Sequence, residues 1–214
     1  MKRILTSVLL GLASITFAQV STATINYKVS LDGELPEGLP ADMFKNMSMT
    51  LAFNGESTRT DFNMGIMNMT TVTNDKQTMT LFNSMGMKFG TIEDGNDSEV
   101  SLFNNKASEE EKPDINLTGK TKTIAGFECK EAIITSDEGN VTVYFTDQIK
   151  PNRISKDFDM GINGFPLEFT INASGMLMKI SATDVKKSTN VDFSMTIPEG
   201  YQKMNADQMK SMMR

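Results

Sequence analysis

Apolar and polar residues alternate with a period of two along most of this chain. Successive side chains of a β-strand point to opposite faces of the sheet, so this alternation predicts strands with one buried face and one wetter face. The clearest cases occupy residues 25–31, 47–53, 141–145, 165–171, 176–182 and 191–197. Residues 62–71 and 79–89 are predicted to form further strands beside residues 47–53.

Short turn sequences separate these strands. Asn54-Gly55, Asn74-Asp75 and Asp94-Gly95 each favour the backbone angles of a tight reversal. Strands that are joined so closely must be antiparallel. The sequence therefore predicts an all-β or β-dominated fold, in which a strongly curved antiparallel sheet forms an incomplete barrel and so limits its exposed edges.

Helical content is predicted to be small. A turn or two at residues 40–45 and a C-terminal helix over residues 205–214 are expected. Asn205 can cap the C-terminal helix, and Met209, Met212 and Met213 give it one apolar stripe. A helix of this length is marginal alone, so we expect it to pack against the sheet.

The N-terminus has the pattern of a cleavable signal peptide. Lys2 and Arg3 precede an apolar stretch that ends at Phe17, and Ala18 precedes the predicted cleavage site. The apolar stretch is shorter than the roughly 20 residues of a membrane-spanning helix. We therefore expect residues 1–18 to be a signal peptide and residues 19–214 to be a single soluble β-rich domain, exported to the periplasm or the cell exterior.

Charge and composition argue against several classes of function. Loss of residues 1–18 would change the formal net charge from −6 to −8, a balance that argues against nucleic acid as a partner. The chain has no histidine, and it shows no nucleophile elbow and no phosphate-binding glycine loop. A non-enzymatic function without catalytic residues, cofactor or metal site is therefore predicted, and Cys129, the only cysteine, is expected to be buried and inert.

Methionine is the unusual component, with 18 residues, several of them in pairs two positions apart. On a strand, that spacing places both thioethers on one face. The predicted function is the binding of a lipid, a lipoprotein acyl chain or another hydrophobic molecule on a concave Met-rich face that can repack around its ligand. The residues expected to form this face are Met47, Met49, Leu51, Phe53, Met64, Met67, Met69, Met79, Met85, Met87 and Phe89.

Two alternatives stay open at the level of the sequence. Methionine also fills irregular gaps in a core, in which case the domain is a structural or protein-interaction module whose partner is another envelope protein. Met-x-Met pairs such as Met67 and Met69 also offer soft ligands for Cu(I) or Ag(I). The sequence identifies neither a particular ligand nor an oligomeric state.

Three segments resemble the landmarks of an uncharacterised bacterial envelope family, domain of unknown function 4412. They are residues 123–132 (TIAGFECKEA), 161–169 (GINGFPLEF) and 197–201 (IPEGY). The second segment also resembles a variant of the signature of the related GLPGLI proteins. The resemblance implies a fold similar to that of the lipoprotein carriers LolA and LolB, and because the family has no established activity it assigns no functional residue.

Overall fold

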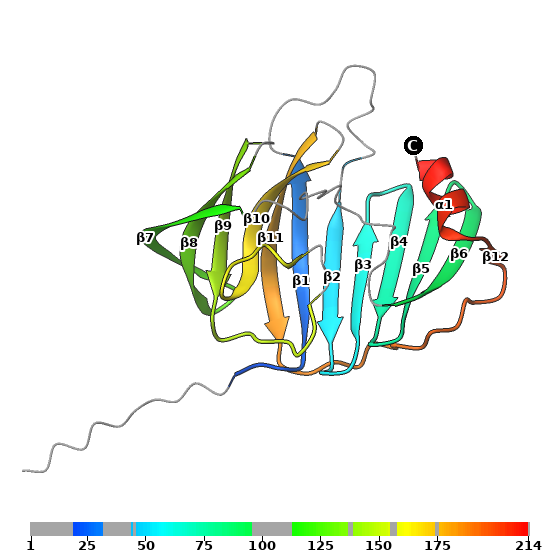
Figure 1. Ribbon diagram of the computed structural model, residues 1–214, viewed down its shortest axis with the longest axis horizontal. Coiled ribbons are helices and arrows are strands. Elements are labelled where there is room, and N and C mark those ends of the chain that lie inside the picture. Colours follow the sequence, from blue (N-terminus) through cyan, green and yellow to red (C-terminus); the bar gives the residue numbers. More distant parts are fainter. Residues whose placement is uncertain are drawn as a thin grey trace, which may run out of the picture.

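A computed structural model of the chain describes residues 19–31, 44, 46–95, 113–136, 139–154, 158–173 and 176–213. Its strands form a 12-stranded sheet in the order β12-β6-β5-β4-β3-β2-β1-β11-β10-β9-β8-β7 (Figure 1). The predicted β-dominated fold, with a strongly curved antiparallel sheet and a C-terminal helix, is confirmed. The predicted signal peptide, residues 1–18, lies outside the described residues, and so does most of the helix expected at residues 40–45.

The sheet consists of two antiparallel meanders. The first contains β1 (Ala23–Leu31), β2 (Ser48–Phe53), β3 (Thr58–Asn63), β4 (Met67–Thr73), β5 (Gln77–Ser84) and β6 (Met87–Asp94). The second contains β7 (Asp114–Ile124), β8 (Phe127–Ser136), β9 (Gly139–Thr146), β10 (Phe165–Ala173) and β11 (Met176–Lys186). Pairing of β1 with β11 joins the two meanders, so β6 and β7 lie toward opposite ends of the sheet.

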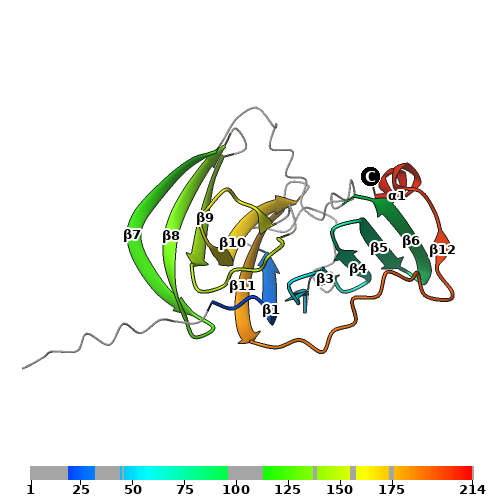
Figure 2. The same ribbon diagram turned by 60° about the horizontal axis from the view of Figure 1, so that its bottom comes forward.

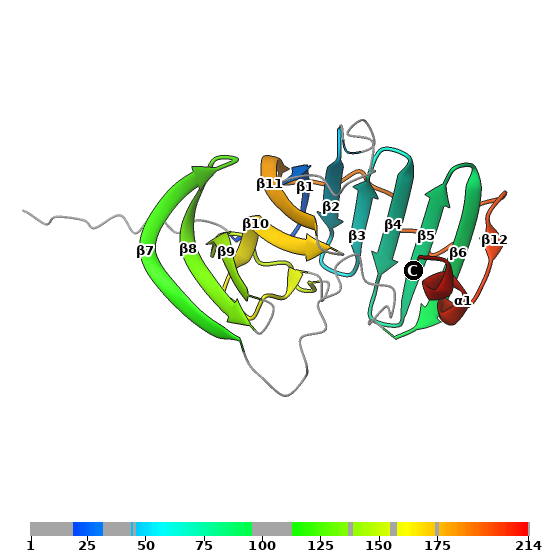
Figure 3. The same ribbon diagram turned by 90° about the horizontal axis from the view of Figure 1, so that it is seen from above.

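The two meanders differ in curvature. Strands β7, β8 and β9 arch over one face of the sheet, whereas β2 to β6 form a flatter wall (Figures 2 and 3). The chain between β9 and β10 lies inside the arch (Figure 3). Its first part is held by Val20, whose amide donates to the carbonyl of Gln148 at 2.9 Å and whose carbonyl accepts from the amide of Lys150 at 2.9 Å.

An aromatic cluster fills the centre of the molecule, where the meanders meet. Phe158, between β9 and β10, lies with its ring centroid 6.3 Å from that of Tyr27, 6.2 Å from that of Phe165 and 5.9 Å from that of Phe169. Phe53 extends the cluster from β2. The buried Tyr27 hydroxyl donates to the carbonyl of Pro166 at 3.1 Å, which satisfies the polar end of the side chain in an apolar core.

The C-terminal segment wraps around the β6 edge of the sheet (Figure 2). Residues 187–201, which we call the C-terminal strap, run along the outer face and pack four side chains against β4 and β5. β12 (Gln202–Lys203) then pairs in parallel with β6, and α1 (Ala206–Met213) buries Met209 on the inner face. The four strap side chains are Phe193, Met195, Ile197 and Tyr201.

A reciprocal cap begins the C-terminal helix. The Asn205 side chain accepts a hydrogen bond from the amide of Gln208 at 2.9 Å, and the Gln208 side chain accepts one from the amide of Asn205 at 3.1 Å. This capping box satisfies amides that the first helical turn leaves without partners. The predicted capping role of Asn205 is therefore confirmed.

Two details of the predicted strand pattern are wrong. Residues 191–197 are extended but form no β-ladder, because their alternation reflects packing of the strap on the outside of the sheet. Residues 62–71 and 79–89 each contain a hairpin turn, around Gly65 and Gly86, instead of one continuous strand. The Met85-Gly86-Met87 triplet therefore lies at a hairpin tip and does not share one strand face.

Candidate ligand-binding cavity

The residues predicted to form a Met-rich face have three different surroundings. Met47, Met49, Leu51 and Phe53 are buried in the main core, and Met64 packs against it. Their side chains contact the central aromatic cluster or its neighbours, so they fill the interior between the two meanders. This part of the predicted face is occupied by the chain itself.

A second group lies beneath the C-terminal helix. Met69 and Phe89 are buried with Phe82 and Met209, and Met67 packs against them. The register pairs Met49, Phe62, Met69, Phe82 and Phe89 in a row across β2 to β6, so these side chains share the inner face. The helix covers the end of this row.

The third group departs from the expected face. Met79 pairs with Val72 and packs under the C-terminal strap, so its inclusion in the inner face is corrected: it lies on the opposite side of the sheet. Met85 and Met87, at the tip of the β5–β6 hairpin, are 76% and 52% exposed. The expectation that all these residues bind a ligand stays a prediction, but they do not form one continuous surface.

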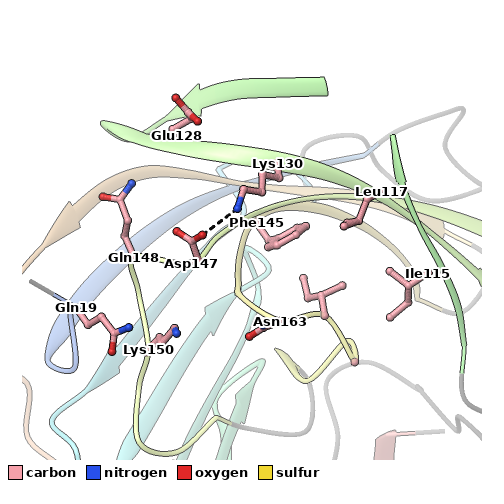
Figure 4. A pocket seen from close by; sticks show the side chains of 12 residues that line it. Gln19, Ile115, Leu117, Glu128, Lys130, Phe145, Asp147, Gln148, Lys150 and Asn163 are labelled. Atoms are coloured by element: carbon pink, nitrogen blue, oxygen red, sulfur yellow. Dashed lines mark hydrogen bonds and ion pairs between the residues drawn. The ribbon is translucent and has the colours of Figure 1, made fainter. Parts of the chain in front are cut away.

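A cavity of about 780 Å³ lies elsewhere, beneath the arch of the second meander. Its wall is the inner face of β7, β8 and β9, and its opposite side is the chain that follows β9 (Figure 4). A smaller cavity of about 260 Å³ shares Lys150, Ile162 and Asn163 with it. The larger cavity is lined by Gln19, Ile115, Leu117, Glu128, Lys130, Phe145, Asp147, Gln148, Lys150, Gly161, Ile162 and Asn163.

One end of the cavity is apolar (Figure 4). Leu117 pairs with Ala132, which pairs with Val143, and this row faces the core side of the sheet. Leu117 is 62% exposed although it is a large apolar side chain on that inner face. Leu117 therefore presents apolar surface to the hollow, beside Ile115, which also lines the hollow and packs against the main core.

The other end carries an ion pair. The Lys130 ammonium donates to Asp147 Oδ2 at 2.9 Å, and both side chains are about half exposed. This hydrogen bond lowers the pKa of the Asp147 carboxyl, and the charge of Lys150 lowers it further. The carboxylate is therefore the stable form of Asp147 beside two ammonium groups.

Gly164 fixes the position of the chain that closes the cavity. A Cβ atom at this position would lie 2.9 Å from the carbonyl oxygen of Thr146 and would overlap the ring of Phe145. Only glycine lets the backbone pass this close to β9. The GINGFPLEF segment therefore has a structural role, because it sets the distance between the closing chain and the wall of the cavity.

The outer face of the same strands is polar and satisfied. Glu131, Tyr144, Glu168 and Ser181 form a row across β8 to β11, opposite the core side. Tyr144 donates to Glu131, which lowers the pKa of this carboxyl and raises that of the phenol. The two carboxylates are buried by their neighbours, so this row behaves as a structural network on the outside of the arch.

Glu168 is the centre of this network. Lys122 Nζ lies 2.9 Å and Lys179 Nζ 3.2 Å from its Oε1, and the Ser181 hydroxyl donates to Oε2 at 2.7 Å. Burial alone would raise the pKa of Glu168, but these hydrogen bonds together lower it. The charge is therefore stabilised by its partners and is not poised for proton transfer at neutral pH.

Cys129 is buried, as predicted. Burial raises the pKa of its thiol to about 11, so the thiol stays protonated near neutral pH. Its neighbour Lys130 lines the cavity, so Cys129 points to the other face of β8. It is not a nucleophile within the cavity.

No helix among the described residues combines the length and the apolar character needed to cross a membrane. The same part of the chain contains no group of three or more His, Cys, Asp or Glu side chains arranged to hold a metal ion.

The cavity was not visible in the sequence because its lining comes from five separate stretches of chain. Alternation shows that Ile115 and Leu117 share a face, but it does not show whether anything fills the space opposite. The signal that the sequence does carry is the close-approach glycine, Gly164, next to a phenylalanine-rich strand.

The fold and the site together define the class of the protein as a curved antiparallel β-sheet with a partly apolar hollow. Within this class, the chain belongs to the family described as Domain of unknown function (DUF4412), whose model matches residues 39–154. A comparison with curated proteins found no match. The relation to GLPGLI proteins stays a prediction.

PNGF-II is among the solved structures that are similar in fold. PNGF-II in a P21 crystal form has a TM-score of 0.52 and 17% identity over 90% of this chain and 33% of its own, and its C2 form has 0.50 and 17% over 89% and 32%. A β-barrel-like protein of domain of unknown function 1849 from Brucella abortus has a TM-score of 0.39 and 11% identity over 79% of this chain and 98% of its own. The chain spans about one third of PNGF-II, and the likeness concerns the fold alone.

Proposed function

We propose that this protein is a non-enzymatic binding protein that holds an amphipathic molecule, such as a lipid or an acyl chain, in the cavity beneath β7, β8 and β9. The observation that carries the proposal is the cavity of about 780 Å³ with apolar side chains at one end and charged and amide side chains at the other. Small-molecule sites have volumes of about 300–1,000 Å³ and combine apolar walls with a few polar groups.

The exposure of Leu117 supports this proposal. A leucine on the inner face of a sheet is normally covered, because burial of its side chain contributes about 1.5–3 kcal/mol. Leu117 instead remains 62% exposed beside Ile115, on the wall of the hollow. An apolar chain lying along β7 would remove this surface from water and gain part of that free energy on binding.

Catalysis is not part of the proposal. The chain has no histidine, and Cys129 is buried with a protonated thiol. The paired carboxylates of Glu131 and Glu168 face away from the cavity and hold structural hydrogen bonds. Binding requires none of these groups to change its protonation state.

The proposal places the protein in the cell envelope or outside the cell. This part rests on the signal-peptide pattern of residues 1–18. A hydrophobic ligand of an envelope protein must be shielded from water between membranes, which is the task that a hollow of this kind suits. The formal net charge of −6 disfavours nucleic acid as a partner.

A second candidate function is protein interaction through exposed hairpin tips. Ile66, at the tip of the β3–β4 hairpin, is 40% exposed, and Met85 and Met87 are exposed at the tip of the neighbouring β5–β6 hairpin. Apolar residues gathered at adjacent tips are typical of a surface that meets another protein. Pull-down with a Met85→Ser, Met87→Ser variant would lose such a partner and leave ligand binding unchanged.

Native mass spectrometry of the protein isolated from its own cells tests the main proposal. We expect a bound molecule of lipid mass, and we expect the Leu117→Glu variant to lose it. Leu177→Glu is the matched control, because Leu177 is also an exposed leucine of a strand, at 48%, but does not line the cavity. Equal ligand loss in both variants, or a bare wild-type protein that takes up no added dodecanoate, would contradict the proposal.

A further inference from the structure

The smaller cavity is a hollow that the proposed function leaves without a role. Its volume is about 260 Å³, and it shares Lys150, Ile162 and Asn163 with the larger cavity. Apart from Asp159 and Gly164, the residues that line only the smaller cavity are all apolar. They are Ile149, Pro151, Ile154, Phe158, Met160 and Phe165.

Ile162 connects the apolar end of the larger cavity with the smaller one. A residue that lines two cavities forms part of the boundary between them, and Ile162 is the apolar residue of the three that do so. Its neighbour Gly161 lies beside β7, since a Cβ atom at Gly161 would be 3.6 Å from Ile115 Cδ1. Ile162 therefore continues the apolar surface of Leu117 and Ile115, which Figure 4 shows at one end of the larger cavity.

The backbone on both sides of Ile162 is held by short hydrogen bonds. The Gly164 amide donates to the Ile162 carbonyl at 2.9 Å, and the Gly161 amide donates to the Asp159 side chain at 3.2 Å. Gly161 has a φ of 70°, which favours glycine. The Ile162 side chain itself is only half-buried, so a change of its rotamer would alter the boundary without moving a strand.

We propose that the smaller cavity is a second compartment of the binding site, which takes the end of a long apolar chain, and that Ile162 controls the passage into it. The inference rests on the proposed function and adds to it the length of the chain. A chain that lies along Leu117 and Ile115 reaches Ile162, and its end gains further burial among the apolar residues of the smaller cavity.

Two fatty acids with the same head and different chain lengths test the inference. Equilibrium dialysis would compare radiolabelled dodecanoate and hexadecanoate at concentrations below micelle formation. Each methylene group that leaves water raises the affinity by up to about fourfold. We therefore expect hexadecanoate to bind to the wild type at least about tenfold more tightly than dodecanoate.

A variant that fills the smaller cavity is the first arm of the test. Ile154 lines only this cavity, so the larger ring in Ile154→Phe should occupy the space. We expect its hexadecanoate affinity to fall to about that of dodecanoate, with dodecanoate binding unchanged. Ile66→Phe is the control, because Ile66 is an exposed isoleucine that lines neither cavity, and it should change neither affinity.

A variant that opens the boundary is the second arm. Ile162→Ala shortens the side chain between the compartments, so it should raise the ratio of hexadecanoate to dodecanoate affinity above that of the wild type. Addition of Ile154→Phe to this variant should remove the increase. Ile92→Ala, at a partly exposed isoleucine of β6 that lines neither cavity, should leave the ratio unchanged.

The outcomes separate the two proposals. Equal wild-type affinity for the two acids, or an unchanged affinity ratio in Ile154→Phe, would overturn the second compartment and confine the ligand to the larger cavity. If Ile154→Phe binds neither acid, an unchanged ratio in Ile162→Ala would overturn it instead. Failure of the wild type to bind either acid would overturn the proposed function itself.

Discussion

The two meanders of the sheet cover their faces by different means. In the first, the chain fills both sides of β4 to β6: α1 covers one end of the inner face and the C-terminal strap covers the outer one. In the second, a polar network covers the outer face and the inner face of β7 to β9 borders an open cavity. One continuous sheet therefore has a filled half and a hollow half.

This difference shows where methionine is used. The buried methionines of β2, β4 and β5 lie in the filled half, where flexible side chains suit the irregular gaps between a twisted sheet, a short helix and a strap. Apart from the polar groups and Gly161, the lining of the hollow consists of leucine, isoleucine and phenylalanine. Methionine content therefore marks packing in this protein and does not locate the cavity.

The largest expected effect is a contrast in stability between the halves. Phe53→Ala removes a fully buried ring that packs on Phe165, so it should lower the free energy of unfolding by about 3–5 kcal/mol. Leu117→Ala removes a mostly exposed side chain and should change it by less than about 0.5 kcal/mol. Urea denaturation measures both. Similar losses in the two variants would show that the space next to Leu117 is filled.

Substitution of one glycine in each half should give effects of intermediate size on stability and should affect ligand binding in the hollow half only. Gly164→Ala places a methyl group against the backbone carbonyl of Thr146, so it should lower the free energy of unfolding by about 1–3 kcal/mol and weaken dodecanoate binding by moving the closing chain. Gly90→Ala, in the filled half, meets the side chains of Ile197 and Leu81 instead and should leave ligand binding intact. Weaker binding in Gly90→Ala than in Gly164→Ala would contradict this assignment of the cavity wall.

The outer faces of the two halves should respond differently to acid. The folded-state pKa of Glu168 is lowered, so its contribution to stability is fully present above the ordinary glutamate pKa of about 4.3 and is lost as the pH falls through the folded-state pKa. As the pH is lowered below about 4.3, the free energy of unfolding should fall less steeply for Glu168→Gln than for the wild type. Parallel acid limbs in the two proteins would show that the network contributes no charge-dependent stability.

The smallest expected effect concerns the reactivity of the Cys129 thiol, which lies on the face of β8 opposite the cavity. Cys129 is buried, and its thiol pKa of about 11 leaves little thiolate at mildly alkaline pH. A thiol-specific reagent should label it only at the rate of unfolding, with or without dodecanoate. Fast labelling of the native protein would mean that the wall between the cavity and the outer network opens.

The sequence predicted the fold class well because alternation depends only on which side of a strand is buried. It failed at residues 191–197, since a strap packed on one side alternates in the same way as a strand. The alternation pattern also missed the turn at Met85 and Gly86. The methionines on either side of Gly86 continue the apolar alternation, so the pattern predicts one strand where the structure has a hairpin turn. The cavity lay beyond prediction because its shape depends on the arch of β7 to β9 and on the path of the chain after β9.

The central claim, that the hollow half binds a ligand and the filled half does not, is tested most directly by methyl NMR. The protein would be labelled at the methionine ε-methyl and isoleucine δ1-methyl groups and titrated with dodecanoate. We predict shifts at Ile115 and Ile162, which line the cavity, and unchanged signals for Met49, Met69 and Met79 in the filled half. Shifts at these methionines with unchanged signals at Ile115 and Ile162 would contradict the account and restore the Met-rich face as the binding site.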